Sequence, residues 1–243
     1  MRDTLIAEYH QTLSHDKRLT PEFFARLKTM MRTRRLLYGD REISVALRPH
    51  LLTRAQYAIL TRTSEVLAGA FEKVASVLLS QPSRMTEIGL TEREIKLALV
   101  EPKYSTLAVT SRLDAFIDDH EIKVVEYNAE NPSSLTDQAG LNEILFEVDA
   151  MRDAAVRYQL TQFRPAEYLL KALLRTFSDW GGTGVPNIAI VDWTGLPTAD
   201  EFHLLRDFFI SRGVPSIICS PEQLEYEKGR LRCGDFPIDL VYK

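Results

Sequence analysis

The sequence predicts a mixed α/β (α+β) fold with a helical N-terminal region, an antiparallel hairpin and a C-terminal α/β unit. Three observations predict it. Apolar residues recur at helical spacing after Thr53, two strand-forming runs flank a polar loop near residues 118–121, and strand-forming runs alternate with a helical pattern from Pro186 onward. We expect the chain to divide into residues 1–48, 49–160 and 161–243.

The composition excludes several classes of protein. A net charge of −4 over 243 residues gives no basic surface for nucleic acid, and no run approaches the roughly 18 apolar residues of a membrane span. The first residues lack the apolar core of a signal peptide. Two cysteines indicate a reducing cytoplasm rather than a disulfide framework. No oligomeric state is indicated.

Capping residues mark the expected helices of the first hundred residues. Thr20 precedes Pro21 as an N-cap precedes the first helical position, and Thr91 with Glu94 forms a capping box. The longest helix has an apolar stripe that predicts a core or a helix–helix seam. The expected helices are residues 4–14, one from 21, 53–79 and one to about 99, and the stripe is Leu60, Leu67, Phe71, Val74 and Leu78.

The C-terminal part predicts a parallel sheet. A strand–helix–strand order implies parallel strands, and ligands of such sheets bind beyond the carboxyl ends of the strands. Asp192 lies at such an end and is a candidate substrate ligand, whereas Thr198 starts a capping box and is expected to cap its helix. The expected helices are 137–151, 165–180 and 198–212, and the expected strands are 187–192, 216–219, 224–226, 230–232 and 238–242.

The most distinctive stretch is the hairpin. Residues 107–117 and 122–127 are strand-forming runs, and side chains alternate across a strand. If the loop is residues 119–121, Asp114 lies opposite Glu126, and Arg112 lies opposite Asn128. We predict this register, because a slip of one residue would scatter the four side chains over both faces.

Two carboxylates directly opposite each other repel, because their Cβ atoms are roughly 4.5–5.5 Å apart. A cation must resolve this conflict. Arg112 could do so structurally, or Mg²⁺ could do so with Asp114, Glu126 and the amide oxygen of Asn128 as ligands. The alternative is a hairpin whose polar face is merely solvated.

The segment after the hairpin is a candidate substrate loop. Asn131 precedes a proline, so its backbone is extended or turned, and Ser133 and Ser134 follow with free hydroxyl and amide groups. This loop would arrive next to a ligand held at Asn128, with Glu130 as a further candidate. The alternative is a cap for the helix that begins near residue 136.

These residues carry a family resemblance. The pattern R-x-D followed by E-x-N-A-E-x-P resembles the signature of the circularly permuted ATP-grasp proteins related to glutathionylspermidine synthase. The resemblance covers residues 48–243, and the further segments that support it are Arg48-Pro49-His50-Leu51-Leu52, Val191-Asp192-Trp193 and Pro237-Ile238-Asp239-Leu240-Val241-Tyr242.

The resemblance implies a ligase that uses ATP and Mg²⁺ to join a small carboxylate to an amine by way of an acyl phosphate. It implies that Arg112 stabilises the transferring phosphate and that Asp114, Glu126 and Asn128 bind Mg²⁺. It also implies that residues 161–243 form the Rossmann-like pre-ATP-grasp domain and that the loop after the hairpin lies near the active centre.

The sequence differs from the members of this family in one respect. Members of the family continue well past the point where this sequence stops, and that half supplies the adenine pocket and the lysines for the nucleotide phosphates. We therefore expect the front half of a ligase, a truncated domain that does not turn over alone. The alternative is a non-catalytic scaffold or small-ligand-binding module.

Overall fold

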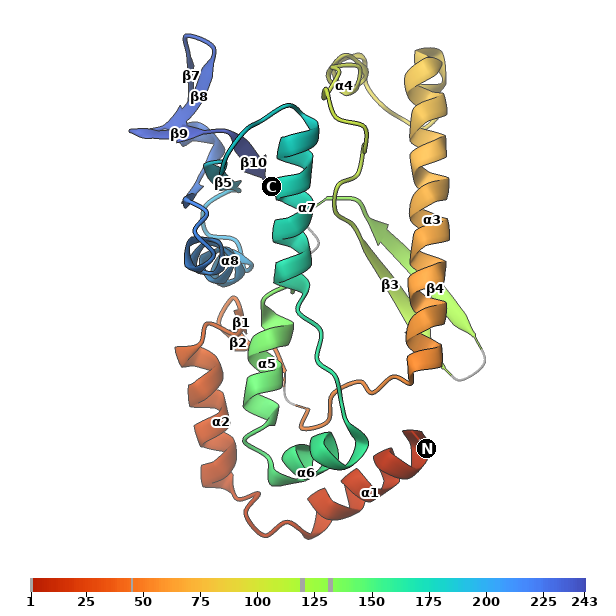
Figure 1. The fold of residues 1–243 in the computed structure, drawn as a ribbon, viewed down its shortest axis with the longest axis vertical. Helices are drawn as coiled ribbons and strands as arrows, with labels where there is room; N and C mark the ends of the chain where they lie inside the picture. The colour runs from red at the N-terminus through yellow and green to blue at the C-terminus, as the bar shows by residue number, and fades with distance from the viewer. Residues whose placement is uncertain (1, 45, 119–120, 131–132) are drawn as a thin grey trace. The chain divides into compact units, whose positions relative to one another are not determined.

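A computed structural model describes residues 2–44, 46–118, 121–130 and 133–243 (Figure 1). Helices and small sheets alternate along the chain, so the mixed α/β class is confirmed. Within the described residues no helix combines the length and the apolar character needed to cross a membrane. The chain forms two compact units. The first is Met1–Leu52, Ser133–Leu174 and Gly184–Lys243, and the second is Thr53–Pro132 and Arg175–Thr183. The expected three-part division stays a prediction.

Two pairs of helices form the helical part of the first unit. In the pair α1 (Arg2–His15) and α6 (Asp149–Tyr158), Leu5 and Tyr9 pack with Met151. In the pair α2 (Pro21–Thr33) and α5 (Asp137–Leu145), Leu27 packs with Ile144. The strands of this part are β1 Leu37–Tyr38 and β2 Arg41–Glu42. As predicted, Thr20 caps α2, its side chain accepting the N–H of Phe23.

The single helix predicted over residues 137–151 is wrong. α5 ends at Leu145, and Val148 takes an extended backbone with φ −86° and ψ 118° before α6 begins. This turn places Val148, only 1% exposed, in the core between α1 and α6. Arg152 Nη1 donates to the carbonyl oxygen of Phe146 at 2.6 Å, satisfying a carbonyl group at the end of α5. Burial of an apolar side chain thus outweighs helix continuity here.

A three-stranded parallel sheet of order β10-β5-β6 forms the rest of the first unit, and the prediction of parallel strands is confirmed. α7 and α8 pack on one face of the sheet, where Phe209 and Ile190 are fully buried. The antiparallel sheet β7-β8-β9 contributes to a second core around Ala189 and Val191. The bounds are α7 Pro165–Asp179, β5 Ile188–Val191, α8 Ala199–Ser211, β6 Ser216–Cys219, β7 Leu224–Glu227, β8 Arg230–Cys233, β9 Phe236–Ile238 and β10 Leu240–Tyr242.

Two smaller predictions about this part are wrong. The expected strand 238–242 is interrupted at Asp239, whose carboxylate accepts the N–H of Asn187 at 2.9 Å and ties the strand junction to the start of β5. Thr198 does not cap α8 through its side chain. Its backbone is already near helical values, with φ −86° and ψ −1°, so its hydroxyl group makes no capping hydrogen bond.

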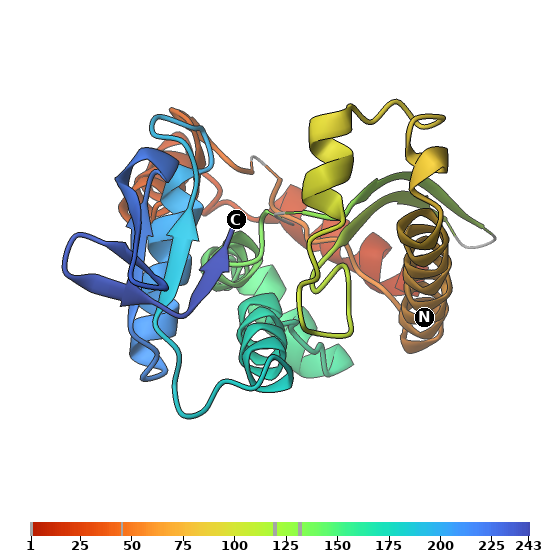
Figure 2. The ribbon, with the colours of Figure 1, turned by 90° about the horizontal axis from the view of Figure 1, so that it is seen from above.

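The second unit consists of α3, α4 and the hairpin, and Figures 1 and 2 show the hairpin beside α3. Phe71 of α3 stacks on Tyr127, with ring centroids 4.1 Å apart and planes 15° from parallel. Glu72 accepts the N–H groups of Leu107 and Ala108, so this segment is a loop and the predicted strand begins only at Arg112. The bounds are α3 Arg54–Ser80, the 3-10 helix Pro82–Met85, α4 Glu92–Ala98, β3 Arg112–Ile117 and β4 Ile122–Asn128.

The first alternative of the prediction, that the apolar stripe of α3 belongs to a core, is wrong. No residue of α3 is buried, and Phe71 and Val74 are 45% and 57% exposed. The stack of Phe71 on Tyr127 is an apolar contact that holds one face of the hairpin against α3.

We predict that Phe71→Ala loosens the hairpin. Loss of a stacked ring pair costs about 0.5–1.5 kcal/mol beyond the lost apolar area, so the amides of β4 should exchange with solvent about tenfold faster by hydrogen-exchange mass spectrometry. Val74→Ala, on the same helix and more exposed, is the matched control and should leave this exchange unchanged. Equal protection of β4 in wild type and Phe71→Ala would contradict the stack as the anchor.

Candidate functional site

The hairpin pairs the four predicted residues as expected. Asp114 lies opposite Glu126, and Arg112 lies opposite Asn128, in the antiparallel pair β3–β4. The predicted register is therefore confirmed. Because opposite residues and residues two apart share a face, all four side chains emerge on the same side of the ribbon.

A β-bulge produces this register. β3 ends at Ile117 and β4 begins at Ile122, so one more residue separates the strands than in the 119–121 loop on which the predicted register was based. Asp118 accepts the N–H of Glu121 at 2.8 Å. Next to this loop Ala115 pairs with Val124, a register that would place Glu126 out of line with Asp114. The shift between Asp114 and Ala115 leaves Val125 without a partner in the pairing and brings the two carboxylates opposite each other.

The opposite face of the ribbon contacts α3. Leu113 and Tyr127 form the intervening pair, and the ring of Tyr127 lies on Phe71. The polar face therefore turns away from α3. The side chains of Arg112 and Asp114 keep 38% and 43% of their exposure.

The polar face carries both a satisfied pair and unsatisfied groups. Arg112 Nε donates to Asp114 Oδ1 at 2.8 Å, which offsets part of the repulsion between the two carboxylates. Among the described residues the exposed carboxylate of Glu126 has no hydrogen bond or ion pair. The side-chain nitrogen of Asn128 is buried and has no hydrogen-bond partner within the described ranges. The two ends of an amide exchange by a 180° flip, so Asn128 could equally turn its oxygen to this position.

This set of groups fits a magnesium ion. Mg²⁺ binds to proteins through one or two carboxylates and keeps waters or substrate phosphates as its other ligands. Asp114, Glu126 and an amide oxygen of Asn128 match that requirement. Over the described ranges no three His, Cys, Asp or Glu residues come together, so a cage made only of such residues has no support.

The other predicted substrate residues lie in different places. Glu130 is exposed two residues after β4, whereas Ser133, Ser134 and Asp192 belong to the first unit. Asp192 lies at the carboxyl end of β5 as predicted, where its carboxylate accepts the N–H of Trp193 at 2.8 Å. Asn131 lies outside the described residues. The substrate-binding roles of these residues stay predictions.

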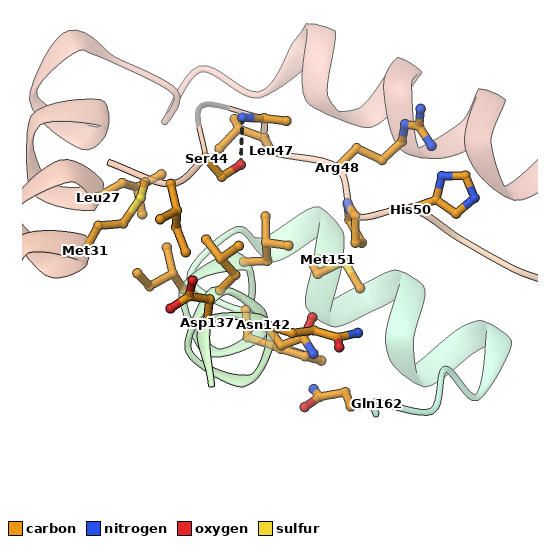
Figure 3. A pocket seen from close by; sticks show the side chains of 18 of the residues that line it. Leu27, Met31, Ser44, Leu47, Arg48, His50, Asp137, Asn142, Met151 and Gln162 are labelled. Atoms are coloured by element: carbon orange, nitrogen blue, oxygen red, sulfur yellow. Dashed lines mark hydrogen bonds between the residues drawn. The ribbon is translucent and has the colours of Figure 1, made fainter. Parts of the chain in front are cut away.

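A cavity of about 640 Å³ opens in the helical part of the first unit (Figure 3). Ser134, with the left-handed φ of 73°, borders it, so one of the predicted substrate residues does line a cavity. Most of the lining is apolar, with polar groups at its edges. The lining includes Leu27, Met31, Leu47, Arg48, Asp137, Asn142, Met151 and Gln162.

Asp137 is the unusual residue of this cavity. It is 9% exposed, and its Oδ1 has no hydrogen-bond partner among the described residues. Burial raises the pKa of Asp137 from 3.8 to about 7, and the negative charges of Glu201 and Asp200 add to the rise. The dipole of α5 favours the ionised form by only about 0.3–1 kcal/mol. The rise in the pKa of Asp137 corresponds to roughly 4 kcal/mol in favour of the neutral form, so the effect of burial is larger.

Sequence reasoning missed Asp137 and Arg48 as cavity residues. An aspartate in the first turn of a helix is ordinary, because the helix dipole favours it there. Asp137 lies near Glu201 and Asp200 of α8, and the cavity beside it is also lined by residues of α2, so its surroundings are distant in sequence. The sequence singles out Arg48 only as part of the segment Arg48-Pro49-His50, which supports the family resemblance.

Comparisons with known proteins agree with the fold. The search of solved structures finds a glutathione synthetase-like effector from Globodera pallida in its apo form, with a TM-score of 0.60 and 12% identity over 94% of this chain. The chain spans 58% of the length of that protein. No family model and no curated protein matches the sequence. At this identity the likeness shows the fold alone.

We predict that Asp137 makes the protein less stable as pH rises. Below pH 4 the carboxyl group is protonated in both folded and unfolded chains. Between pH 4 and 7 the unfolded chain ionises first, so the unfolding free energy falls, by about 4 kcal/mol at most, and then stays level. Asp137→Asn should remove this fall, as measured by urea unfolding at several pH values. Asp153→Asn, an exposed change on α6, should keep it, and parallel pH curves for wild type and Asp137→Asn would contradict the raised pKa.

Proposed function

We propose that the chain provides the metal–phosphate face of an ATP-dependent carboxylate–amine ligase of the circularly permuted ATP-grasp type, similar to glutathionylspermidine synthase. The observation that carries the proposal is the register of the hairpin, which gathers a guanidinium group, two carboxylates and an unsatisfied amide group on one face. The fold of the structural neighbour is consistent with an ATP-grasp-like scaffold.

Each residue has a role in this proposal. Asp114, Glu126 and Asn128 would hold Mg²⁺, which would supply positive charge to neutralise the phosphate oxygens of ATP. The hydrogen bond from Arg112 Nε to Asp114 holds the guanidinium group at the polar face, where its positive charge would stabilise the transferring phosphoryl group. The role of Arg112 is to stabilise charge on that group rather than to move a proton.

The reaction has two balanced steps. The substrate carboxylate attacks the γ-phosphorus of ATP, the bond to the β-phosphate oxygen breaks, and ADP leaves. The amine nitrogen then attacks the acyl carbon, the bond from that carbon to the phosphate breaks, phosphate leaves and a proton is lost from nitrogen.

Since the chain spans 58% of its structural neighbour, the residues that bind the adenine and the nucleotide phosphates are proposed to lie outside it. A cytoplasmic location fits the two free cysteines and the supply of ATP.

A second candidate is a non-catalytic scaffold or small-ligand-binding module. The ion pair of Arg112 with Asp114 favours it, because an exposed pair of this kind already offsets part of the carboxylate repulsion, worth about 0.2–1 kcal/mol. In that case the hairpin needs no metal. Calorimetric titration of the full-length protein with ATP and Mg²⁺ separates the two candidates, since only the ligase requires binding at the hairpin.

We predict that Asp114→Asn and Glu126→Gln each lower ADP release by the full-length protein, measured with a panel of carboxylates and amines. Loss of one group that stabilises charge in the transition state typically costs about 100-fold to 1,000-fold in rate. Glu121→Gln is the matched control, because Glu121 lies at the loop end of the same hairpin and pairs with Lys123. Wild-type ADP release by both site variants would exclude the ligase role of the hairpin.

A further inference from the structure

We propose that the cavity of the first unit binds a small amphipathic zwitterion, with its ammonium group at Asp137, its carboxylate at Arg48 and an apolar body between them. A short apolar peptide with free termini has this chemistry. The cavity lies within residues 24–51 and 134–163 of the first unit, so the inference does not rest on the hairpin or on the ligase function.

The acidic end of the cavity lacks a partner. Asp137 is more than nine-tenths buried, lines the cavity, and has an oxygen without a hydrogen bond among the described residues. Figure 3 shows its carboxyl group on the side of the cavity where Leu27 and Met31 lie. A buried polar group without a partner costs about 1–3 kcal/mol. An ammonium group would satisfy this oxygen, and the neighbouring charges of Glu201 and Asp200 would attract it further.

The basic end of the cavity lacks a carboxylate partner among the described residues, and Arg48 lies near the neutral side chain of Tyr9. Arg48 is half-buried, and it forms no ion pair with a carboxylate in the part of the chain that the structure describes. Other arginines of the same unit do, such as Arg26 with Glu147 and Arg32 with Glu42. A guanidinium group left unpaired at a cavity wall is suited to a carboxylate, which it can bind through two parallel hydrogen bonds.

The two charges lie apart from each other. Asp137 and the segment Arg48–His50 lie at opposite sides of the cavity in Figure 3, and no ion pair joins Asp137 to Arg48. A ligand with a single charge would satisfy only one of them. Because opposite charges separated across one cavity are complementary to a dipolar molecule, a zwitterion satisfies both.

The space between them is suited to an apolar body. Leu47 and Met151 line the cavity between the two charged sites, and the amide side chains of Asn142 and Gln162 offer hydrogen bonds to peptide groups. A volume of about 640 Å³ lies within the range of roughly 300–1,000 Å³ that small-molecule sites occupy. Both the size and the lining therefore fit a peptide of two or three apolar residues.

The test uses leucyl-leucine and trileucine with the whole chain, by isothermal titration calorimetry at neutral pH. We expect binding by at least one of them at millimolar concentration or below. N-acetylation removes the ammonium group and C-terminal amidation removes the carboxylate, and each change should weaken binding about tenfold or more. Absence of binding by both free peptides would overturn the proposal.

Variants assign each end of the peptide. The acetylated peptide should bind wild type and Asp137→Asn equally, whereas the free peptide should bind the variant about tenfold more weakly. Likewise, the amidated peptide should bind wild type and Arg48→Gln with equal affinity, whereas the free peptide should bind Arg48→Gln more weakly. Asp153→Asn and Arg93→Gln, both exposed and outside the lining, are the matched controls. Circular dichroism checks that each variant is folded.

The outcomes separate this proposal from the ligase function. Binding of the free peptide should survive Asp114→Asn with Glu126→Gln, because these residues lie in the second unit. Equal affinity of free and capped peptides, or loss of affinity in the control variants alone, would show that the charges do not recognise the peptide and would overturn the proposal. Loss of ADP release with intact peptide binding would leave the cavity proposal standing.

Discussion

Electrostatic repulsion between two carboxylates is the constraint on which the polar face of the hairpin depends. Asp114 and Glu126 lie directly opposite each other, an arrangement that destabilises a sheet unless a cation is close. Arg112 supplies one positive charge through Asp114, while Glu126 has no such partner among the described residues. The ribbon is thus left with a negative charge and an unsatisfied amide group at the same place, which is the chemistry that a magnesium-bound phosphate would complete.

Packing decides that this face is available. The stack of Tyr127 on Phe71 holds the apolar face of the ribbon against α3. The bulge at Val125 shifts the strand register so that Asp114 and Glu126 lie opposite each other. Neither contact involves the polar groups themselves. An apolar contact on one side and a backbone irregularity near the loop therefore set the geometry of the charged side.

Local chemistry explains which features the sequence could predict. Thr20, Thr53 and Thr91 act as N-caps because the hydrogen bonds of a cap lie within four residues. Alternation predicts that the four polar side chains share a face, but the number of residues between the strands alone would misalign Asp114 and Glu126, and no sequence signal predicts the bulge that restores the register. Val148, before α6, packs with α1, more than a hundred residues away in sequence, and Asp137 lies near Glu201 and Asp200 of α8. No local pattern records either feature. In α3 the spacing of apolar residues predicts a stripe on one helix face, but the spacing does not show whether another element covers that stripe.

The most direct test of the hairpin's role is to place a paramagnetic ion where Mg²⁺ is proposed to bind. Mn²⁺ with ATP, added to the full-length protein labelled with ¹⁵N, should broaden the amide resonances of residues 112–114 and 126–128 selectively, and Asp114→Asn should abolish the effect. Broadening confined to other parts of the protein, or unchanged by that substitution, would contradict the assignment of this face as the site of the metal-bound phosphate.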